Sequence, residues 1–128
     1  MIKRELTLSK AKKRAWSVFS LWIRQRGCIG NTNTCITCGR VKQIKELQAS
    51  HFIPGRHNAT LFDERGCWPA CYTCNVVLGS NPIKYYKWML KKYGQEMIDE
   101  LERLSETTVK YTVEDYLEIE SKYKKLLK

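Results

Sequence analysis

The sequence predicts a mixed α+β fold, with helices at both ends of the chain and a small centre of turns and short strands. Three observations support this prediction. Two Cys-x2-Cys pairs, Cys35/Cys38 and Cys71/Cys74, punctuate the middle of the chain. Apolar residues recur every three or four positions before and after these pairs, which is the spacing of helices that bury one face. Between the pairs, residues 48–53 have the composition of a strand.

The chain has 128 residues, the size of one domain. Its net charge of +10 favours a polyanionic partner over a surface that is charged only for solubility. Residues 1–26 carry eight Lys or Arg and one acid, residues 27–94 carry nine and three, and residues 95–128 carry six and nine. We therefore expect the first two parts to face a polyanion and the acidic last part to face away from it.

These differences suggest two parts, a basic helix with a cysteine-rich core at 1–94 and a helical extension at 95–128. The extension either belongs to the same domain or forms a dimerisation element. No apolar run approaches 18 residues, so no membrane span is expected, and the first five residues lack the apolar centre of a signal peptide. We expect a cytoplasmic protein, and in that compartment paired cysteines are metal ligands rather than disulfides.

The first predicted helix runs from about Ser9, as its N-cap, to Gln25, and Gly27 would end it. Its apolar stripe consists of Ala15, Trp16, Phe19, Trp22 and Ile23. Its basic side chains have no compensating acids and are Lys10, Lys12, Lys13, Arg14, Arg24 and Arg26. A solvated face around a core stripe is the alternative, but the uncompensated charge favours contact with phosphates.

The first cysteine pair lies in residues 27–40, which are rich in Gly and Asn and predict turns. Gly39 directly follows Cys38, where a glycine lets the backbone amides fold over the sulfur atoms. Four thiolates in two such pairs suit tetrahedral zinc, and a site closed by four cysteines is structural rather than catalytic. Cys28 and Cys67 are expected as small buried side chains, although Cys67 could replace a ligand.

The segment from Gln48 to Ile53 predicts a strand that runs into Pro54. Within it, His51 carries an imidazole that titrates near neutrality and can accept a proton from water. The alternative for this histidine is a packed, hydrogen-bonded ring with no chemical role.

Residues 54–66 predict a long polar loop without structure of its own, and such loops are usually functional. The side chains of interest in this loop are Arg56, His57, Asp63, Glu64 and Arg65. The alternative for the last three is ordinary loop pairing, for example between Asp63 and Arg65.

Residues 67–75 contain the second cysteine pair and are expected to form a second turn like the first. Asn81, as N-cap, and Pro82 then open a helix that Gly94 closes. The predicted buried face of this helix consists of Ile83, Tyr86, Leu90 and Tyr93. A second helix, Gln95–Glu106, has a stripe of Met97, Ile98, Leu101 and Leu104.

The last predicted helix opens with a capping box formed by Thr112 and Asp115. Its apolar side chains are Val113, Tyr116, Leu117, Tyr123, Leu126 and Leu127. They can pack on the same chain, but for residues 112–128 we favour pairing or exchange between two chains, because this segment is outside the cysteine core.

The order Cys-x2-Cys, His-x2-Pro, Cys-x2-Cys-Asn resembles that of the HNH, or His-Me finger, nucleases, and within them the NinG (Rap) family of phage recombination endonucleases. The segments that carry the resemblance are C-I-T-C-G at 35–39, A-S-H-F-I-P at 49–54, R-H-N-A-T at 56–60, F-D-E-R at 62–65, C-x3-C-x2-C-N at 67–75 and K-W-M-x3-Y-G at 87–94. The chain is also similar to phage endonuclease VII, which has a four-cysteine zinc, a histidine between the pairs and an asparagine after the last cysteine.

The resemblance implies a zinc-stapled ββα-metal core, flanked by N- and C-terminal helices, in which His51 is the general base and Asn75 helps to hold Mg²⁺ or Mn²⁺ on the scissile phosphate. A hard divalent ion bound by oxygen atoms would neutralise the charge that develops there. The implied activity is hydrolysis of phosphodiester bonds in branched or recombination-intermediate DNA, in a cell that carries a phage or prophage. The expected DNA contacts are Lys10, Lys12, Lys13, Arg14, Arg24, Arg56 and Arg65.

Three positions depart from the general HNH pattern: Ser50 stands where an Asp ligand is common, Gly66 where the middle Asn is found, and Trp68 where the family has a His. The side chains available as replacement catalytic groups or metal ligands are His57, Asp63 and Glu64. The weakened motif leaves a non-catalytic zinc-finger DNA-binding protein as the alternative. A zinc-dependent RNA binder, whose aromatic side chains stack on bases, is a third possibility.

Because resolution of a four-way junction needs two nicks related by a near two-fold axis, a C2 homodimer would supply the two sites. We expect its contact to use residues 112–128 and to leave the basic surface exposed.

Overall fold

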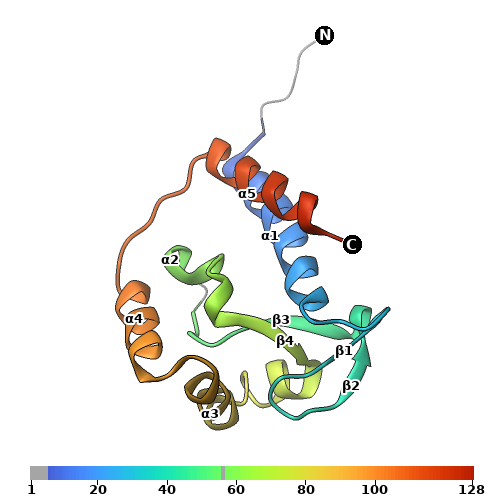
Figure 1. Ribbon diagram of the computed structural model, residues 1–128. Helices are drawn as coiled ribbons and strands as arrows, with labels where there is room; N and C mark the ends of the chain where they lie inside the picture. Colours follow the sequence, from blue (N-terminus) through green and yellow to red (C-terminus); the bar gives the residue numbers. More distant parts are fainter. Residues whose placement is uncertain (1–5, 56) are drawn as a thin grey trace.

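The computed structural model describes residues 6–55 and 57–128. It confirms a mixed α+β fold: two separate two-stranded antiparallel sheets lie at the centre, with helices around them (Figure 1). Of the helices, α1 contacts both strands of the central β3–β4 hairpin and also packs along α5. The arrangement places the two cysteine pairs at the ends of the strands, where the two sheets meet.

Helix α1 spans Leu8–Gln25, and its N-cap lies two residues earlier than the sequence predicts. The hydroxyl of Thr7, rather than of Ser9, accepts a hydrogen bond from Lys10 N at 3.2 Å and caps the helix. The predicted apolar stripe is confirmed, since its centre is fully buried at Ala15, Phe19 and Ile23.

The first sheet is a hairpin of β1 (Thr32–Thr34) and β2 (Val41–Gln43), and η1 (Ile44–Glu46) follows it. We predicted turns over residues 27–40, which contain β1, and no strand at β2, because three-residue strands of mostly polar residues show no alternation. Asn33 explains the local order: its buried amide donates to the carbonyl groups of Arg24 and Arg26 and joins the hairpin to the end of α1.

The central hairpin pairs β3 (Leu47–His51) with β4 (Cys67–Cys71), from Leu47 opposite Cys71 to His51 opposite Cys67. The predicted strand continued to Ile53, but the ladder ends at His51. Phe52 and Ile53 turn away to pack in the cluster around α3 and α4.

The prediction of an unstructured loop at 54–66 is wrong. The segment contains α2 (Asn58–Leu61) and η2 (Glu64–Gly66), whose lengths of four and three residues are too short to give a periodic pattern. Arg56, an expected DNA contact, lies outside the described residues.

The second cysteine pair spans the end of β4 and the turn η3 (Thr73–Val77), and α3 (Pro82–Tyr93) and α4 (Gln95–Ser105) follow. The predicted buried face of α3 is wrong, because the helix buries Tyr85 and Met89. Of the residues that we placed inside, Ile83, Tyr86 and Leu90 are exposed, and Tyr93 is half-buried against the cluster that contains Tyr85 and Met89. The predicted face of α4 is confirmed at Ile98 and Leu101.

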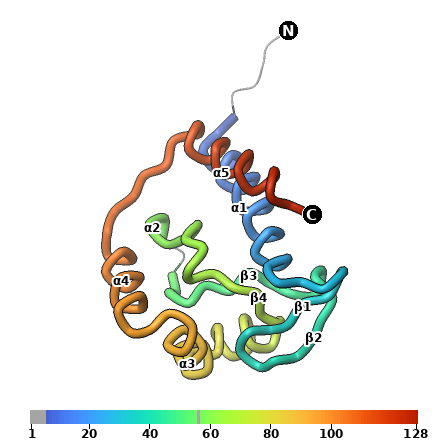
Figure 2. Tube along the Cα trace, in the orientation of Figure 1, coloured from blue at the N-terminus to red at the C-terminus, as the bar shows by residue number. Residues whose placement is uncertain are grey.

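Helix α5 (Val113–Leu126) opens with the predicted capping box and lies beside α1 of the same chain (Figures 1 and 2). Tyr116 and Tyr123 are its buried residues, and Tyr123 meets Phe19 edge to face at 4.8 Å. The same chain thus covers Tyr116 and Tyr123, whereas Leu126 of the predicted stripe is 49% exposed. Among the described residues, no helix is both long and apolar enough to cross a membrane.

Candidate functional site

The four cysteines of the two pairs form one cluster, and the sulfur atoms of Cys35, Cys38, Cys71 and Cys74 all lie within 4.8 Å of one another. In a tetrahedral site with Zn–S bonds of ~2.3 Å, sulfur atoms are about 3.8 Å apart. The Cys38 and Cys71 sulfur atoms are 3.8 Å apart. The number, type and spacing of the ligand atoms therefore fit a structural zinc ion.

The backbone around the cluster favours thiolates. Burial raises the pKa of Cys35, but hydrogen bonds from the Thr37 hydroxyl and from backbone amides outweigh it and lower that pKa to about 6. Burial and the neighbouring thiols raise the pKa of Cys38 to about 12. A divalent cation would hold all four side chains as thiolates, because metal binding displaces the thiol protons. Asn81 holds the N-cap position of α3, and its amide makes no cap but donates to Cys74 Sγ at 3.7 Å.

The remaining two cysteines do not join the cluster. Cys67 is fully buried against Phe19, Ile23 and Tyr123, as expected of a small core side chain, and is not a replacement ligand. Cys28 is only half-buried, so its prediction as a buried residue is wrong.

His51 is the last residue of β3 and is half-buried. Its ring stacks on Trp16 of α1, with centroids 5.2 Å apart and planes inclined by 23°. Its Nε2 lies 3.0 Å from the carbonyl oxygen of Leu61. Because a carbonyl can only accept a hydrogen bond, Nε2 carries the proton in the neutral ring and Nδ1 carries the lone pair.

Asn75 directly follows Cys74, and its amide is oriented by residues on both sides. Its Nδ2 donates to Gln48 Oε1 of β3 at 2.7 Å, and its Oδ1 accepts from the Ser80 hydroxyl at 3.4 Å. These two hydrogen bonds fix which side of the Asn75 amide is nitrogen and which is oxygen. The Oδ1 atom of Asn75 therefore faces Ser80.

His51 and Asn75, 24 residues apart in the sequence, line the same cavity of about 340 Å³. The described residues that line this cavity are Trp16, Ala49, His51, Pro54, Gly55, Asn75, Gly79 and Ser80. None of these described residues is an Asp or Glu. Ser80 and Trp16 were not among the predicted site residues, since the sequence shows Trp16 only as part of a helix stripe and gives no signal for Ser80.

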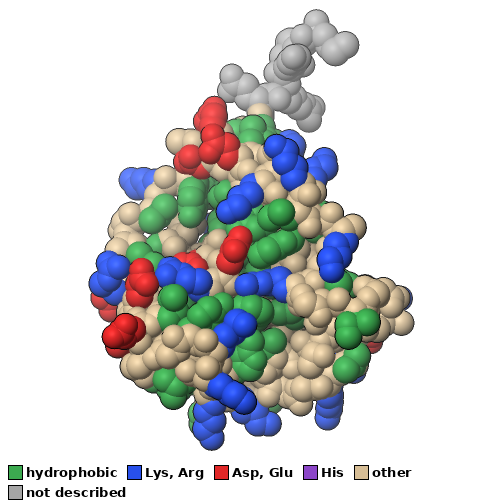
Figure 3. All heavy atoms as spheres, viewed as in Figure 1, with side chains coloured by type: hydrophobic (Ala, Val, Ile, Leu, Met, Phe, Trp, Pro, Cys, Tyr) green, Lys and Arg blue, Asp and Glu red, His purple; other side chains and the backbone are tan. Residues whose placement is uncertain are grey.

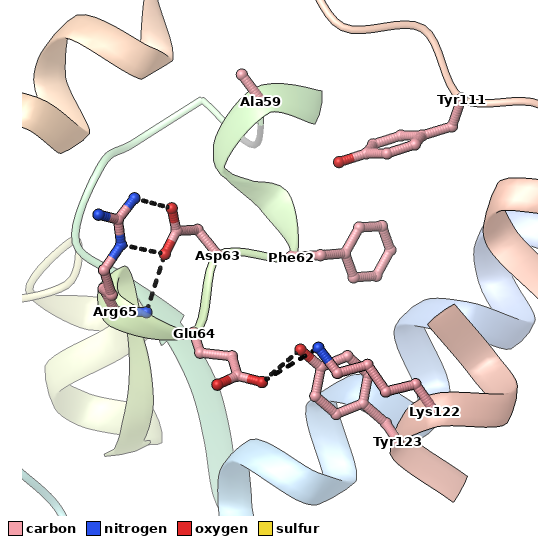
Figure 4. Close-up of a pocket in the computed structure, with 8 residues that line it drawn as sticks. All are labelled: Ala59, Phe62, Asp63, Glu64, Arg65, Tyr111, Lys122 and Tyr123. Atoms are coloured by element: carbon pink, nitrogen blue, oxygen red, sulfur yellow. Dashed lines mark hydrogen bonds and ion pairs between the residues drawn. The ribbon is translucent and has the colours of Figure 1, made fainter. Parts of the chain in front are cut away.

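The loop candidates lie elsewhere. The carboxylate of Asp63 accepts from Arg65 at 2.6 Å, and both residues line a separate hollow of about 450 Å³ with Glu64 and Tyr123 (Figure 4). The structure therefore does not bring Asp63 to His51 and Asn75. His57 is exposed, and its ring lies over Gly55, where an added Cβ would be 2.8 Å from Nε2. It borders the cavity without lining it.

The three positions that depart from the HNH pattern serve the interior. Ser50 is fully buried, and its carbonyl accepts from the Tyr85 hydroxyl at 2.7 Å. Trp68 meets Trp88 edge to face at 4.8 Å, and the Arg26 guanidinium lies 3.4 Å from its ring centroid. Gly66 is buried beside Leu101. None of these three positions supplies a ligand to the cavity.

The basic residues predicted to contact DNA differ in their partners. Lys10 and Lys13 are exposed, while Lys12 Nζ donates to Asn58 Oδ1 at 3.3 Å. Lys12 and Lys13 precede Trp16 by one helical turn, so they lie on the side of α1 that borders the cavity. The two further arginines on α1 are less available, Arg14 because it pairs with Glu120 at 2.8 Å and Arg24 because it donates to Ser20 O.

Burial lowers the pKa of Arg24. Arg65 is held by two carboxylates, at 2.6 Å from Asp63 and 3.1 Å from Glu100, and the hydrogen bonds that Arg65 donates to Asp63 raise the pKa of Arg65. On the side of α1 that borders the cavity, Lys12 and Lys13 therefore supply most of the available positive charge.

The chain resembles known phage proteins along nearly its whole length. It is 30% identical over 128 residues to Protein ninG of Escherichia phage 933W, covering 93% of this chain and 63% of that protein. It is 27% identical to Protein ninG of Escherichia phage lambda, covering 93% of this chain and 62% of that protein. The chain thus spans less than two thirds of the length of these relatives, and no solved structure matches it. The family model described as Bacteriophage Lambda NinG protein matches residues 3–128, and the chain belongs to this NinG family.

Proposed function

We propose that this chain is a metal-dependent DNA endonuclease of the His-Me finger type, with His51 as general base. The observation that carries the proposal is that His51 and Asn75 line one cavity. A general base and an oxygen ligand for a divalent ion both take part in metal-assisted hydrolysis of a phosphodiester.

The order of elements supports the same proposal. The hairpin of β3 and β4 is followed by the helical turn η3, which corresponds to the ββα order of the nuclease core. His51 ends the first strand, and Asn75 lies in the helical turn. Since Cys71 ends β4 and Cys74 precedes Asn75, a zinc ion on the cysteine cluster would hold Asn75 in place relative to β3.

In the proposed reaction, Nδ1 of His51 accepts a proton from the attacking water. The Leu61 carbonyl and the Trp16 ring orient the imidazole for this step. The Oδ1 atom of Asn75 would ligate Mg²⁺ or Mn²⁺, and the Ser80 hydroxyl is the neighbouring oxygen. As the water oxygen bonds to phosphorus and the bond to the leaving oxygen breaks, a bound ion would supply positive charge that stabilises the phosphate and the leaving oxygen.

Branched DNA is the proposed substrate because the matched segments of this chain resemble phage recombination endonucleases. The net charge of +10 and the basic residues on the cavity side of α1 support a nucleic-acid substrate. The setting of the proposed activity is the cytoplasm of a host cell.

The test is a nicking assay on a four-way junction with Mg²⁺, Mn²⁺ or no added ion. Wild-type protein should cut with either ion, and His51→Ala should bind the junction without cutting it. The matched variant His51→Gln keeps a side-chain N–H that can reach Leu61 but offers no base, so it should also be inactive. Cutting by either variant at the wild-type rate would overturn the assignment of the base.

One observation favours a second candidate, a zinc-containing DNA-binding protein without catalysis. The described lining of the cavity holds no carboxylate to anchor the divalent ion. The same assay separates the two functions: DNA binding with unchanged zinc content and no nicking by wild-type protein under any ion would favour the second.

The proposal includes a homodimer for paired nicks, formed through residues 112–128. Exchange of α5 between two chains would keep the contact between α5 and α1 that the single chain makes in cis. Light scattering should give twice the chain mass, and deletion of residues 112–128 should leave a species that nicks but does not resolve. Paired cuts by a clean monomer would contradict the dimer.

A further inference from the structure

Three consecutive apolar residues protrude beside the cavity. Val76, Val77 and Leu78 are 49%, 64% and 50% exposed. They directly follow Asn75 and precede Gly79, and both of these residues line the cavity. A run of exposed apolar side chains is unfavourable in water and marks a surface that another molecule covers.

Backbone hydrogen bonds and an unusual backbone conformation fix the position of these three residues. Leu78 N donates to Thr73 O and Ser80 N donates to Asn75 O, both at 2.9 Å. The chain then passes through left-handed conformations at Gly79, Ser80 and Asn81, with φ of 55°, 72° and 51°. Ser80 and Asn81 are the non-glycine residues with positive φ in the described part of the chain. Such a conformation persists only where the surrounding structure imposes it.

The charge around residues 76–78 favours a polyanionic partner. Residues 66–95 contain four Lys and no Asp or Glu. Lys84 and Lys87 are exposed on the first turns of α3, directly after the protrusion. In Figure 3, Lys and Arg side chains project along the lower edge, where α3 lies in Figure 1, whereas acidic side chains lie over α4 and toward the start of α5. An apolar projection among cations is complementary to a base stack bordered by phosphates.

We propose that residues 76–78 form an apolar wedge that inserts between base pairs at a branch point, while the adjoining cavity takes the phosphate beside the opened step. The inference rests on the proposed function, since it assigns DNA to that cavity. Insertion requires unstacking, and unstacking costs least where a branch already interrupts the stack. The wedge would thus give a preference for branched over linear DNA without base-specific contacts.

The test measures binding, not cleavage, and uses no added Mg²⁺ or Mn²⁺. 2-Aminopurine, whose fluorescence rises on unstacking, is placed at the branch of a four-way junction and at the same step of a linear duplex. The variant is Val77→Ser combined with Leu78→Ser. Its control is Val41→Ser on β2, because Val41 is 65% exposed and Val77 is 64% exposed.

Wild-type protein and Val41→Ser should raise the fluorescence at the branch and prefer the junction. The double variant should lose the fluorescence rise, and its preference for the junction should fall by about tenfold. Its zinc content and its affinity for linear duplex should be unchanged, which shows that the fold is intact.

The outcomes separate the two proposals. A double variant that keeps the fluorescence rise and the preference overturns the wedge, and cutting by wild-type protein would still support the nuclease. Unstacking by a wild-type protein that never cuts supports the wedge and overturns the nuclease. If the wild-type protein is a dimer that the double variant makes monomeric, with unchanged fluorescence, the surface binds a second copy and the wedge is overturned. A wild-type protein that binds no DNA overturns both.

Discussion

The cysteine cluster and the cavity of His51 and Asn75 are neighbouring sites built on the same hairpin, yet they offer very different atoms to a cation. The cluster brings four sulfur atoms of one chemical type within 4.8 Å of one another. The cavity offers an imidazole, an amide and a hydroxyl, and the described part of its lining holds no carboxylate. The first can therefore bind a cation without help. Under the proposed function, the second would bind its ion only with the added charge of a DNA substrate.

This difference suggests a division of labour. Four thiolates bind zinc tightly enough for the binding free energy to become folding free energy. Mg²⁺ is usually held by few protein ligands, together with water and substrate phosphates. We infer that the cluster maintains the fold and that the cavity binds its ion only together with DNA. The following predictions test that contrast, from the largest effect to the smallest.

The largest effect is expected from Cys71→Ser. It removes one thiolate from the cluster and, since Cys71 ends β4, it also disturbs the hairpin. The protein should lose its zinc and unfold, as elemental analysis and far-UV circular dichroism would show.

The control for this change is Cys28→Ser, because Cys28 lies outside the cluster. It should keep both zinc and helicity. If Cys71→Ser protein were folded without metal, folding would not depend on zinc binding by the cluster.

Asn75→Ala should act on the other site alone. Loss of Oδ1 should slow junction cutting and raise the Mn²⁺ concentration for half-maximal rate by about tenfold or more, because an oxygen ligand is lost. Zinc content should stay the same. An unchanged metal titration curve would remove Asn75 from the ion site.

A weaker effect is expected from Lys12→Ala combined with Lys13→Ala. Both lysines lie one turn from Trp16 on the cavity side of α1. Affinity should fall alike for all DNA sequences, and the slope of log affinity against log salt should decrease by roughly 2. Replacement of Lys124 and Lys125, exposed on α5, by Ala is the comparison and should leave the slope nearly unchanged. Equal losses in both variants would mean that binding follows total charge rather than the cavity side of α1.

The smallest effect concerns the ion pair between Arg14 and Glu120, which joins α1 to α5. The hydrogen bond from Arg14 lowers the pKa of Glu120 below its ordinary value of 4.5. A lowered carboxyl pKa stabilises the fold above the ordinary value, and this contribution is lost as the pH falls through the pKa of the folded state. Glu120→Gln should lower Tm at pH 7, but only slightly because Arg14 is half-exposed, and this loss should shrink as the pH falls below 4.5. A loss of equal size at every pH would mean that packing, rather than charge, is responsible.

The sequence predicts the cysteine cluster well because its ligands are few, identical and regularly spaced. The sequence also predicts the long helices, because an apolar stripe such as that of α1 repeats over several turns. The strands β1 and β2 and the turn α2 are three or four residues long, so they leave no period to detect.

The failures at α3 and Asp63 have another cause. Tyr85 and Ile83 are both apolar enough for a core, and the contacts of α3 with α4 and the central hairpin decide which one is buried. Asp63 has a suitable side chain in a suitable loop, but Arg65 lies two residues away and pairs with it. Neither choice can be made from the local sequence.

The most direct test of the central contrast is a count of bound metal ions per chain. His51→Ala protein, which should bind DNA without cutting it, is dialysed and analysed with Mn²⁺ present, with and without a four-way junction. We predict that one zinc ion stays with the chain in both samples and that Mn²⁺ binds only when the junction is present. Absence of zinc, or Mn²⁺ bound equally well without DNA, would contradict the account.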